Sequence, residues 1–238
     1  MSIRYEMNTA ILNKIPGSPL AYWVGKKFGD IYDHKKIGNV AEVITGMTIG
    51  DNNKYLRLWF EVENKKLALN KNSMKDINIA VQNWIPYSKG GERTNWYGGY
   101  DYVVNWKEKE KFNRSKTTLQ YLYLKEALTW PFISGSKLTA KLLPVGFLWD
   151  VAGSPCFFND KTYEYYVLAF LTTPVSNYIL NIVNPTINVQ AIDIARLPII
   201  ECNDINFVVL KVKDNIEISA IDWNDNEISW DFKKHPLI

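Results

Sequence analysis

The segment from Asn83 to Trp106 places the strongest constraint on how this chain can fold. It holds seven aromatic residues and four glycines within 24 positions. Rings at this spacing do not line one helical face, and glycines interrupt helices while allowing tight turns. The segment therefore predicts short strands joined by turns. Its aromatic residues are Trp84, Tyr87, Trp96, Tyr97, Tyr100, Tyr102 and Trp106, and its glycines are Gly90, Gly91, Gly98 and Gly99.

The hydrophobic pattern elsewhere predicts an α+β fold, with a mostly antiparallel sheet and flanking helices. A first helix is expected over residues 19–36, with Ser18 as N-cap. A second is expected over 163–183, with a cap at Asp160 or Thr162 and a kink at Pro174, and a third over 204–220. Strands are expected over 40–44, 55–62, 127–133, 138–143, 146–151 and 192–200, the runs within 127–151 forming one small antiparallel sheet.

No repeat or flexible linker divides the chain, so we interpret residues 1–238 as a single domain. Three sub-regions are distinguishable within it. Residues 15–62 form a helix followed by a loop and strand, residues 63–160 are basic, aromatic and β-rich, and residues 161–238 are helical and acidic.

Charge is unevenly distributed along the chain. Residues 1–150 carry 22 basic and 14 acidic residues, whereas residues 151–238 carry 6 and 11. The basic excess is densest over residues 65–125, with 12 basic and 5 acidic residues. A local basic surface indicates an anionic partner, either nucleic acid or a membrane surface. The alternative is that these lysines only keep this part of the chain soluble.

Several classes of function have little support in the sequence. No apolar run approaches a membrane span and no signal peptide is recognisable, so we expect a cytoplasmic protein without a membrane partner. Cys156 and Cys202 are expected as reduced, buried thiols, and His34 and His235 lie too far apart in sequence to suggest a metal centre. Phosphate-binding, dinucleotide and nucleophile-elbow motifs are missing. We therefore expect no catalytic residue, metal or cofactor in this chain, and we interpret the charged run at 108–111 as a solvated helix face.

The aromatic segment also contains the best candidate for a binding site, between Lys89 and Gly99. Lys89 and Arg93 can neutralise phosphates, the glycine amides permit close approach, and Trp96 or Tyr97 can stack on or wedge between bases. The competing interpretation assigns the tryptophans to the core. A second loop, residues 46–54, offers donors and acceptors for bases or phosphate, although its residues are also ordinary turn formers. Arg57 beside it is expected to form a surface salt bridge.

Four segments together resemble a known family. They are Ile15–Trp23 (IPGSPLAYW), Gly46–Trp59 (GMTIGDNNKYLRLW), Trp84–Trp106 (WIPYSKGGERTNWYGGYDYVVNW) and Asn184–Asn188 (NPTIN), and the closing Ser229–Phe232 followed by His235–Leu237 fits the same pattern. In this order they resemble the non-catalytic region of PglX-type adenine-specific DNA methyltransferases of BREX phage-defence systems. The Gly46 pattern also resembles fused type II restriction-modification enzymes.

The resemblance implies a fold similar to the target-recognition domains of restriction-modification specificity subunits, and double-stranded DNA as partner. The family's catalytic Asn-Pro-Pro-Tyr is absent, because Asn184-Pro185 continues as Thr-Ile, and no glycine-rich S-adenosylmethionine loop is present. Methyl transfer and S-adenosylmethionine are thus expected on a partner catalytic domain or subunit, and this chain is expected to be no enzyme. The alternative is a protein-interaction module of the defence complex, which docks a methyltransferase without binding DNA.

The resemblance also divides the candidate residues by role. Family members recognise different targets, so the shared block is expected to position phosphates, and base recognition is expected on the polar segments between shared blocks. Arg114 could contact a guanine edge and Asn113 an adenine edge. The phosphate-positioning candidates are Lys89, Gly90, Gly91, Arg93 and Lys107, and the base-recognition candidates are Asn52, Asn113, Arg114, Lys116, Thr117 and Lys137, the last in the turn Ser134–Lys137.

Overall fold

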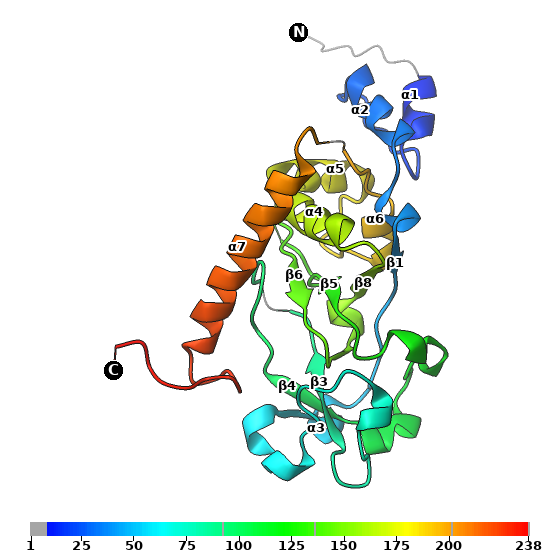
Figure 1. Ribbon diagram of the computed structural model, residues 1–238. Coiled ribbons are helices and arrows are strands. Elements are labelled where there is room, and N and C mark those ends of the chain that lie inside the picture. Colours follow the sequence, from blue (N-terminus) through cyan, green and yellow to red (C-terminus); the bar gives the residue numbers. More distant parts are fainter. Residues whose placement is uncertain (1–8, 92, 136, 201, 238) are drawn as a thin grey trace.

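A computed structural model describes residues 9–91, 93–135, 137–200 and 202–237, and shows an elongated α+β molecule with two four-stranded sheets (Figure 1). The first sheet has the order β1-β8-β5-β6 and the second β2-β4-β3-β7. The strands are β1 (Ala41–Val43), β2 (Leu56–Leu58), β3 (Trp84–Ser88), β4 (Tyr102–Asn105), β5 (Ala127–Thr129), β6 (Lys141–Leu143), β7 (Leu148–Trp149) and β8 (Pro155–Phe158).

Helices α4, α5 and α6 gather next to the first sheet, α1 and α2 lie beyond them at that end of the molecule, and α7 runs along the side (Figure 1). The α-helices are α1 (Thr9–Lys14), α2 (Lys26–Asp30), α3 (Asn52–Tyr55), α4 (Lys161–Leu171), α5 (Pro174–Val183), α6 (Ala191–Ala195) and α7 (Ile205–Asn224). The 3₁₀ helices are η1 (Ile31–Asp33), η2 (Ile37–Asn39), η3 (Trp59–Glu61), η4 (Asn64–Lys66), η5 (Met74–Asp76), η6 (Trp106–Lys111), η7 (Thr117–Leu122) and η8 (Val151–Gly153).

The first sheet separates two hydrophobic clusters. Successive residues of a strand point to opposite faces, and here each face meets a different cluster. Leu128 and Cys156 belong to the cluster that includes the helices, whereas their neighbours Ala127 and Phe157 belong to the cluster around the second sheet. This arrangement explains why these strands appear in the sequence as continuous apolar runs and not as alternating ones.

The aromatic segment forms two strands of the second sheet, as predicted. β3 and β4 pair antiparallel, with Trp84 opposite Asn105 and Tyr87 opposite Tyr102. The prediction that residues 127–151 form one antiparallel sheet is wrong for β7, which pairs in parallel with β3. The chain turns at Gly146, whose φ is +102° and whose N–H donates to the Leu124 carbonyl. This turn directs β7 into the second sheet.

The predicted helices of the C-terminal third are present. Asp160 caps α4 by accepting from the Thr162 N–H, and Asp204 caps α7 by accepting from the Phe207 N–H. The expected kink at Pro174 is a complete break, because Thr173 caps a new helix with Pro174 in its first turn. No single helix in the described residues is long and apolar enough to span a membrane; α4 and α5 reach that length only as a pair bent by 80°.

Three further predictions are wrong. Residues 192–200 do not form a strand, because α6 occupies Ala191–Ala195. A short apolar run fits either element, and here a capping box between Gln190 and Asp193 favours the helix. Residues 19–36 contain the helical turns α2 and η1 in place of one long helix, and Ser18, at φ +44°, is part of a turn and not a cap. The strand expected over 55–62 ends at Leu58, where η3 follows.

Both cysteines are free thiols, but burial differs between them. Cys156 is buried, as expected, and burial raises the pKa of its thiol well above the usual value. Cys202 is exposed, so the prediction of a buried thiol is wrong there. The charged run at 108–111 lies on η6, where Lys111 pairs with Glu108, consistent with a solvated helical surface.

An ion pair between the half-exposed Lys161 and the buried Glu164, at the start of α4, gives a prediction of pH-dependent stability. The Glu164 side chain is fully buried against Lys161, which also lies 2.5 Å from Glu126. Burial raises the pKa of Glu164, while Lys161 opposes that rise. Replacing Lys161 with methionine leaves the buried Glu164 carboxylate without its cation; because Lys161 is itself half-exposed, the free energy of unfolding should fall by about 1–2 kcal/mol at neutral pH, less than for a fully buried pair.

This loss should shrink as the pH falls. Between the ordinary pKa of a glutamate and the raised pKa of Glu164, the folded state binds more protons than the unfolded state, so acidification favours folding. Urea denaturation of the Lys161→Met variant from about pH 5 to pH 8 measures this dependence. The control Lys211→Met, which removes an exposed partner of Asp214, should have little effect at any pH. A loss independent of pH would contradict the explanation.

Candidate nucleic-acid interface

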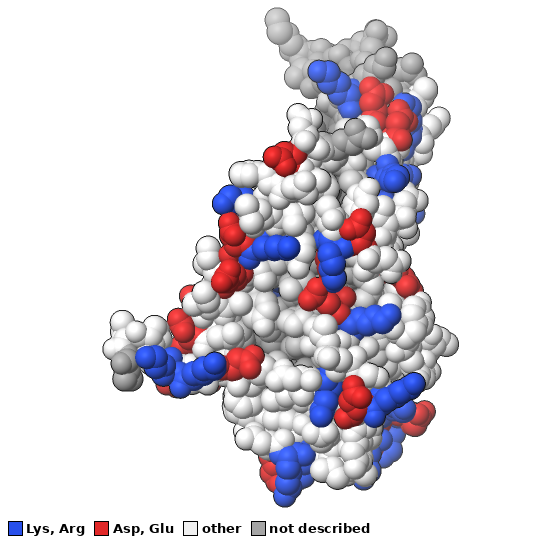
Figure 2. Space-filling view, in the orientation of Figure 1, with Lys and Arg blue, Asp and Glu red and all other residues white. Residues whose placement is uncertain are grey.

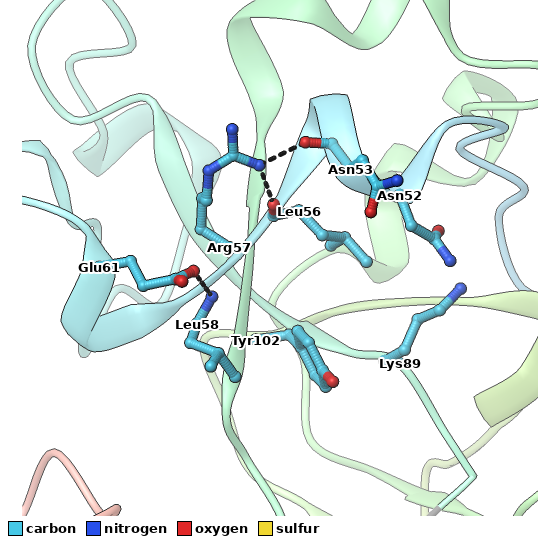
Figure 3. Close-up of a pocket in the computed structure, with 8 residues that line it drawn as sticks. All are labelled: Asn52, Asn53, Leu56, Arg57, Leu58, Glu61, Lys89 and Tyr102. Carbon is cyan, nitrogen blue, oxygen red and sulfur yellow. Dashed lines mark hydrogen bonds between the residues drawn. The ribbon is translucent and has the colours of Figure 1, made fainter.

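A groove in the second sheet brings together residues from three separate segments (Figure 3). Its volume is about 420 Å³. Asn52 and Lys89 point toward one another, and Arg57 on β2 lies on the other side of Leu56, next to Asn53 (Figure 3). The groove's amide, guanidinium, ammonium and hydroxyl groups suit an anionic ligand, and the groove is also lined by two leucines and by the Glu61 carboxylate, which accepts from the Leu58 N–H at 2.9 Å. The lining residues are Asn52, Asn53, Leu56, Arg57, Leu58, Glu61, Lys89 and Tyr102.

Arg57 is held in a fixed orientation at the groove. Its Nη1 donates to the carbonyl oxygens of Asn53 at 2.5 Å and Leu56 at 2.6 Å. Within the described parts of the chain Arg57 makes no salt bridge, so the expected surface ion pair is not found. Its charge is thus available to a ligand, and the remaining guanidinium nitrogens can donate to a phosphate oxygen.

Lys89 is less free than the sequence indicates. Its Nζ lies 2.9 Å from Oδ2 of Asp150, whose side chain is only 3% exposed. The same carboxylate accepts from the Tyr87 hydroxyl at 2.9 Å and from the Ala152 N–H at 2.9 Å. Burial, and secondarily the Asp150 charge, raise the pKa of Tyr87 well above its usual value. The predicted phosphate contact of Lys89 therefore has to coexist with this internal pair.

The residues Asp150 to Ser154, here called the Asp150 junction, hold two of the predicted loops in place. A Cβ on Gly46 would lie 2.0 Å from the Asp150 carbonyl oxygen, and a Cβ on Gly90 would lie 2.0 Å from the Ala152 carbonyl oxygen. Only glycine permits such close backbone approach. Met47 adds two backbone hydrogen bonds, to Trp149 and Val151, of 3.0 and 2.7 Å. The loop at 46–54 and the turn at Gly90 consequently share one support.

Two of the base-recognition candidates, Asn113 and Arg114, contact the loop at 46–54, which itself contains a third, Asn52. The backbones of Thr48 and Arg114 pair through hydrogen bonds of 2.8 and 3.0 Å. The side chain of Asn113 packs against Gly50, where a Cβ would meet its Oδ1 at 2.9 Å. Burial, and then the charge of Arg114, lower the pKa of Lys116. Thr117 is exposed where η7 begins.

Arg93 lies near the turn that leads to another candidate, Lys137. A Cβ on Gly135 would lie 3.2 Å from Nη2 of Arg93, so the guanidinium rests against the turn that carries Lys137. Both cations are exposed. One residue of each of these segments, Glu92 and Ser136, lies outside the described residues. The structure therefore places Arg93 against Gly135, two residues before Lys137, and places Asn113 and Arg114 against the loop that contains Asn52.

Comparison with known proteins places these groups in a family context. No protein-family model matches the chain. It is 33% identical over 98% of its length to the adenine-specific methyltransferase PglX of Lacticaseibacillus casei (strain Zhang). It is 34% identical over 94% of its length to the adenine-specific methyltransferase BrxX of Escherichia coli O9:H4 (strain HS). The chain matches one region of PglX-type adenine-specific methyltransferases. That region spans about a fifth of the length of either relative.

Two predicted site residues of this PglX-type region are used in packing. Trp96 is half-buried against the cluster that includes the helices, and its backbone bonds to Ala140 and Leu142 at 3.0 and 2.9 Å. Tyr97 is half-buried and meets Tyr100 edge to face at 5.0 Å. Such packing argues against the stacking or wedge role proposed for both rings. It favours the competing interpretation that the tryptophans are structural, as does the buried ring of Trp106.

The sequence reasoning missed two residues of the PglX-type region that organise the site. Asp150 is the buried acceptor at the junction, and Arg57 is the fixed cation of the groove. The glycines at 46 and 90 are the available sequence signal for Asp150, because they mark close backbone approach, but they do not identify what approaches. Lys107 is exposed on η6, as its proposed phosphate contact requires.

The surface charge of the PglX-type region is mixed and not uniformly basic. Figure 2 shows Lys and Arg interspersed with Asp and Glu over the face in view. The basic excess of residues 65–125 therefore does not create a field of one sign over that face. Attraction of an anion would depend on local groups such as Arg57, Arg93 and Arg114.

Proposed function

We propose that this chain is the double-stranded DNA recognition region of a PglX-type adenine-specific methyltransferase acting in phage defence. Methyl transfer and S-adenosylmethionine binding would take place in another domain or subunit, in the cytoplasm. The proposal rests on one observation: the loop at 46–54 and the turn at Gly90 both pack against the Asp150 junction, which fixes them relative to each other. Polar recognition residues attached to one rigid support can act in register with a duplex.

Two kinds of side chain support the proposal: cations that suit phosphates, and planar polar groups that suit base edges. Arg57, Arg93 and Lys107 present positive charge without a carboxylate partner among the described residues, which suits phosphate contacts. Asn113 and Arg114 present planar amide and guanidinium groups, which match base edges in the major groove. A charged lipid surface would require only the cations, so the planar groups favour DNA.

Neutralising Arg93 and Lys107 together, as Arg93→Gln with Lys107→Gln, should weaken binding to all duplex sequences alike. Each lost phosphate contact should reduce the slope of log K against log salt concentration by about 0.9. Fluorescence anisotropy with several labelled duplexes over a salt series measures both quantities. The matched control is Lys233→Gln with Lys234→Gln, which makes the same charge change near the C-terminus and should leave the slope nearly unchanged.

Two results would contradict this assignment. Binding that does not respond to salt would exclude a phosphate-dominated interface. A variant that loses affinity for one sequence and not for the others would mean that Arg93 or Lys107 contacts bases.

A second candidate function has its own support. α7 exposes a stripe of apolar side chains, and of its 20 residues, all of them described, only Val212 is fully buried. The stripe consists of Phe207, Leu210, Ile218 and Ile221, each 55–65% exposed. Such a face fits a protein-interaction module that docks a methyltransferase partner. Co-purification with that partner, without any mobility shift of DNA, would favour this function over DNA recognition.

A further inference from the structure

Helix α7 has apolar side chains on two opposite faces. One face packs on the body of the molecule through Val208, Val212 and Ile216, which join the cluster that includes the helices. The other face carries the exposed stripe of Phe207, Leu210, Ile218 and Ile221. Because successive helical residues are rotated by about 100°, the four stripe residues fall within about 80° of arc, on the side away from the packed face. Each is more than half exposed, so the described part of the chain leaves this second apolar face uncovered.

The stripe is symmetric about its middle residue, Asp214. Phe207 and Ile221 lie seven positions before and after Asp214, and Leu210 and Ile218 lie four positions before and after it. If two copies of α7 pack antiparallel and cross at Asp214, Phe207 faces Ile221 of the other copy, and Leu210 faces Ile218. A twofold dimer requires this kind of self-complementary surface, because one patch meets an identical patch. The order of residues in α7 therefore fits a second copy of the chain.

Charges beside the stripe have the same symmetry. Lys213 and Glu217 lie one turn apart along the same edge of the stripe. In the antiparallel arrangement, Lys213 of each copy lies within about 3 Å, along the helix axis, of Glu217 of the other copy. Both residues are exposed, and neither forms a salt bridge in the described ranges of the chain. The Lys213 ammonium rests over the Tyr165 ring, 5.4 Å from its centroid, a contact that leaves its charge unneutralised. A second copy would therefore supply opposite charges to both residues.

We propose that two copies of this chain pair through antiparallel α7 helices, with the stripe at the centre and reciprocal Lys213–Glu217 contacts along one edge. Asp214, which lies where the helices cross, is already paired with Lys211 at 3.0 Å, so two unbalanced like charges do not meet there. A methyltransferase partner covering the stripe would require no symmetry about Asp214. One helix on another buries an area at the low end of specific interfaces, so the dimer should be reversible. The pairing goes beyond DNA recognition, because it needs no DNA and brings two recognition regions into one particle.

Charge exchange in the full 238-residue chain, without DNA, tests this pairing. Sedimentation equilibrium from low to high protein concentration measures dimerisation. The wild-type chain should form a reversible dimer. Lys213→Glu and Glu217→Lys should each weaken dimerisation about tenfold, because both Lys–Glu contacts become contacts between like charges. An equimolar mixture of the two variants should dimerise again, because each mixed dimer restores opposite charges at both contacts.

The stripe has its own pair of variants. Ile218→Glu places a charge in the stripe and should abolish dimerisation, whereas the matched control Ile192→Glu, at a 50% exposed isoleucine on α6, should dimerise as the wild type. All four variants should keep the wild-type melting temperature, because the changed residues are exposed. A wild-type chain that stays monomeric at every concentration overturns the proposal, and binding of that monomer to a methyltransferase through the stripe would assign the stripe to that partner. A wild-type dimer whose two charge variants associate no better when mixed overturns the antiparallel pairing.

Discussion

Replacing Asp150 with alanine is expected to lower the free energy of unfolding by about 3–5 kcal/mol, the largest effect of any single substitution at the site. The substitution removes the shared acceptor of Lys89 Nζ, the Tyr87 hydroxyl and the Ala152 N–H. Lys89 would be left as a partly buried cation without its partner, and Tyr87 as a buried hydroxyl without its acceptor. Each orphaned donor carries a desolvation cost.

Asp150→Asn serves as the conservative comparison. The amide oxygen can still accept from Tyr87 or Ala152, so the loss should be smaller than for alanine, about 1–3 kcal/mol. Urea denaturation measures both values, and hydrogen exchange over residues 46–54 and 89–93 shows whether the loops loosen. An alanine variant that loses less than about 1 kcal/mol, with unchanged exchange in both loops, would contradict the role of Asp150 as their common support.

Replacing Gly90 with alanine is expected to produce the second large effect. The new Cβ would lie 2.0 Å from the Ala152 carbonyl oxygen, at a backbone φ of +71° that favours glycine. Because a backbone atom, and not a flexible side chain, blocks the space, the turn would have to move away from the junction. We expect a loss of about 3 kcal/mol or more, from the clash together with the unfavourable φ.

Gly91 provides the control for the turn. Its φ is +93°, but a Cβ there would meet no atom within 4 Å. Gly91→Ala should therefore cost only the conformational penalty, about 1 kcal/mol. The difference between the two variants in thermal or urea denaturation isolates the close approach of Gly90 to Ala152. Equal losses would show that backbone conformation alone requires glycine at 90, and that the contact with the junction adds nothing.

Features determined by neighbouring residues could be predicted from the sequence. The cap at Asp160 and the extended, turn-rich character of the aromatic segment follow from the residues immediately around them, and the structure has both as expected. Features determined by distant contacts could not be predicted. β7 is a two-residue strand whose partner is β3, about 60 positions earlier, and α6 is a five-residue helix whose apolar pattern fits a strand equally well.

The same distinction applies to the candidate site. Cations such as Arg93 and Lys107 are visible in the sequence, and both are exposed as their roles require. The pairing of Lys89 with Asp150 spans 61 residues and has no local signature. Nor could the sequence decide between exposed and packed tryptophans, since aromatic residues favour cores and binding surfaces alike. The half-buried ring of Trp96, packed against the cluster that includes the helices, favours the structural role at that position.

The most direct test of DNA recognition is a selection from randomised duplex DNA. It should be carried out with the isolated chain and with the chain joined to a catalytic methyltransferase partner, at physiological and at low salt. We predict that both enrich a common motif, that enrichment by the isolated chain is stronger at low salt, and that Arg114→Ala relaxes the motif at one position without abolishing binding. Failure of both forms to enrich any motif, with the chain folded and the partner active, would contradict the claim that this chain recognises a DNA sequence.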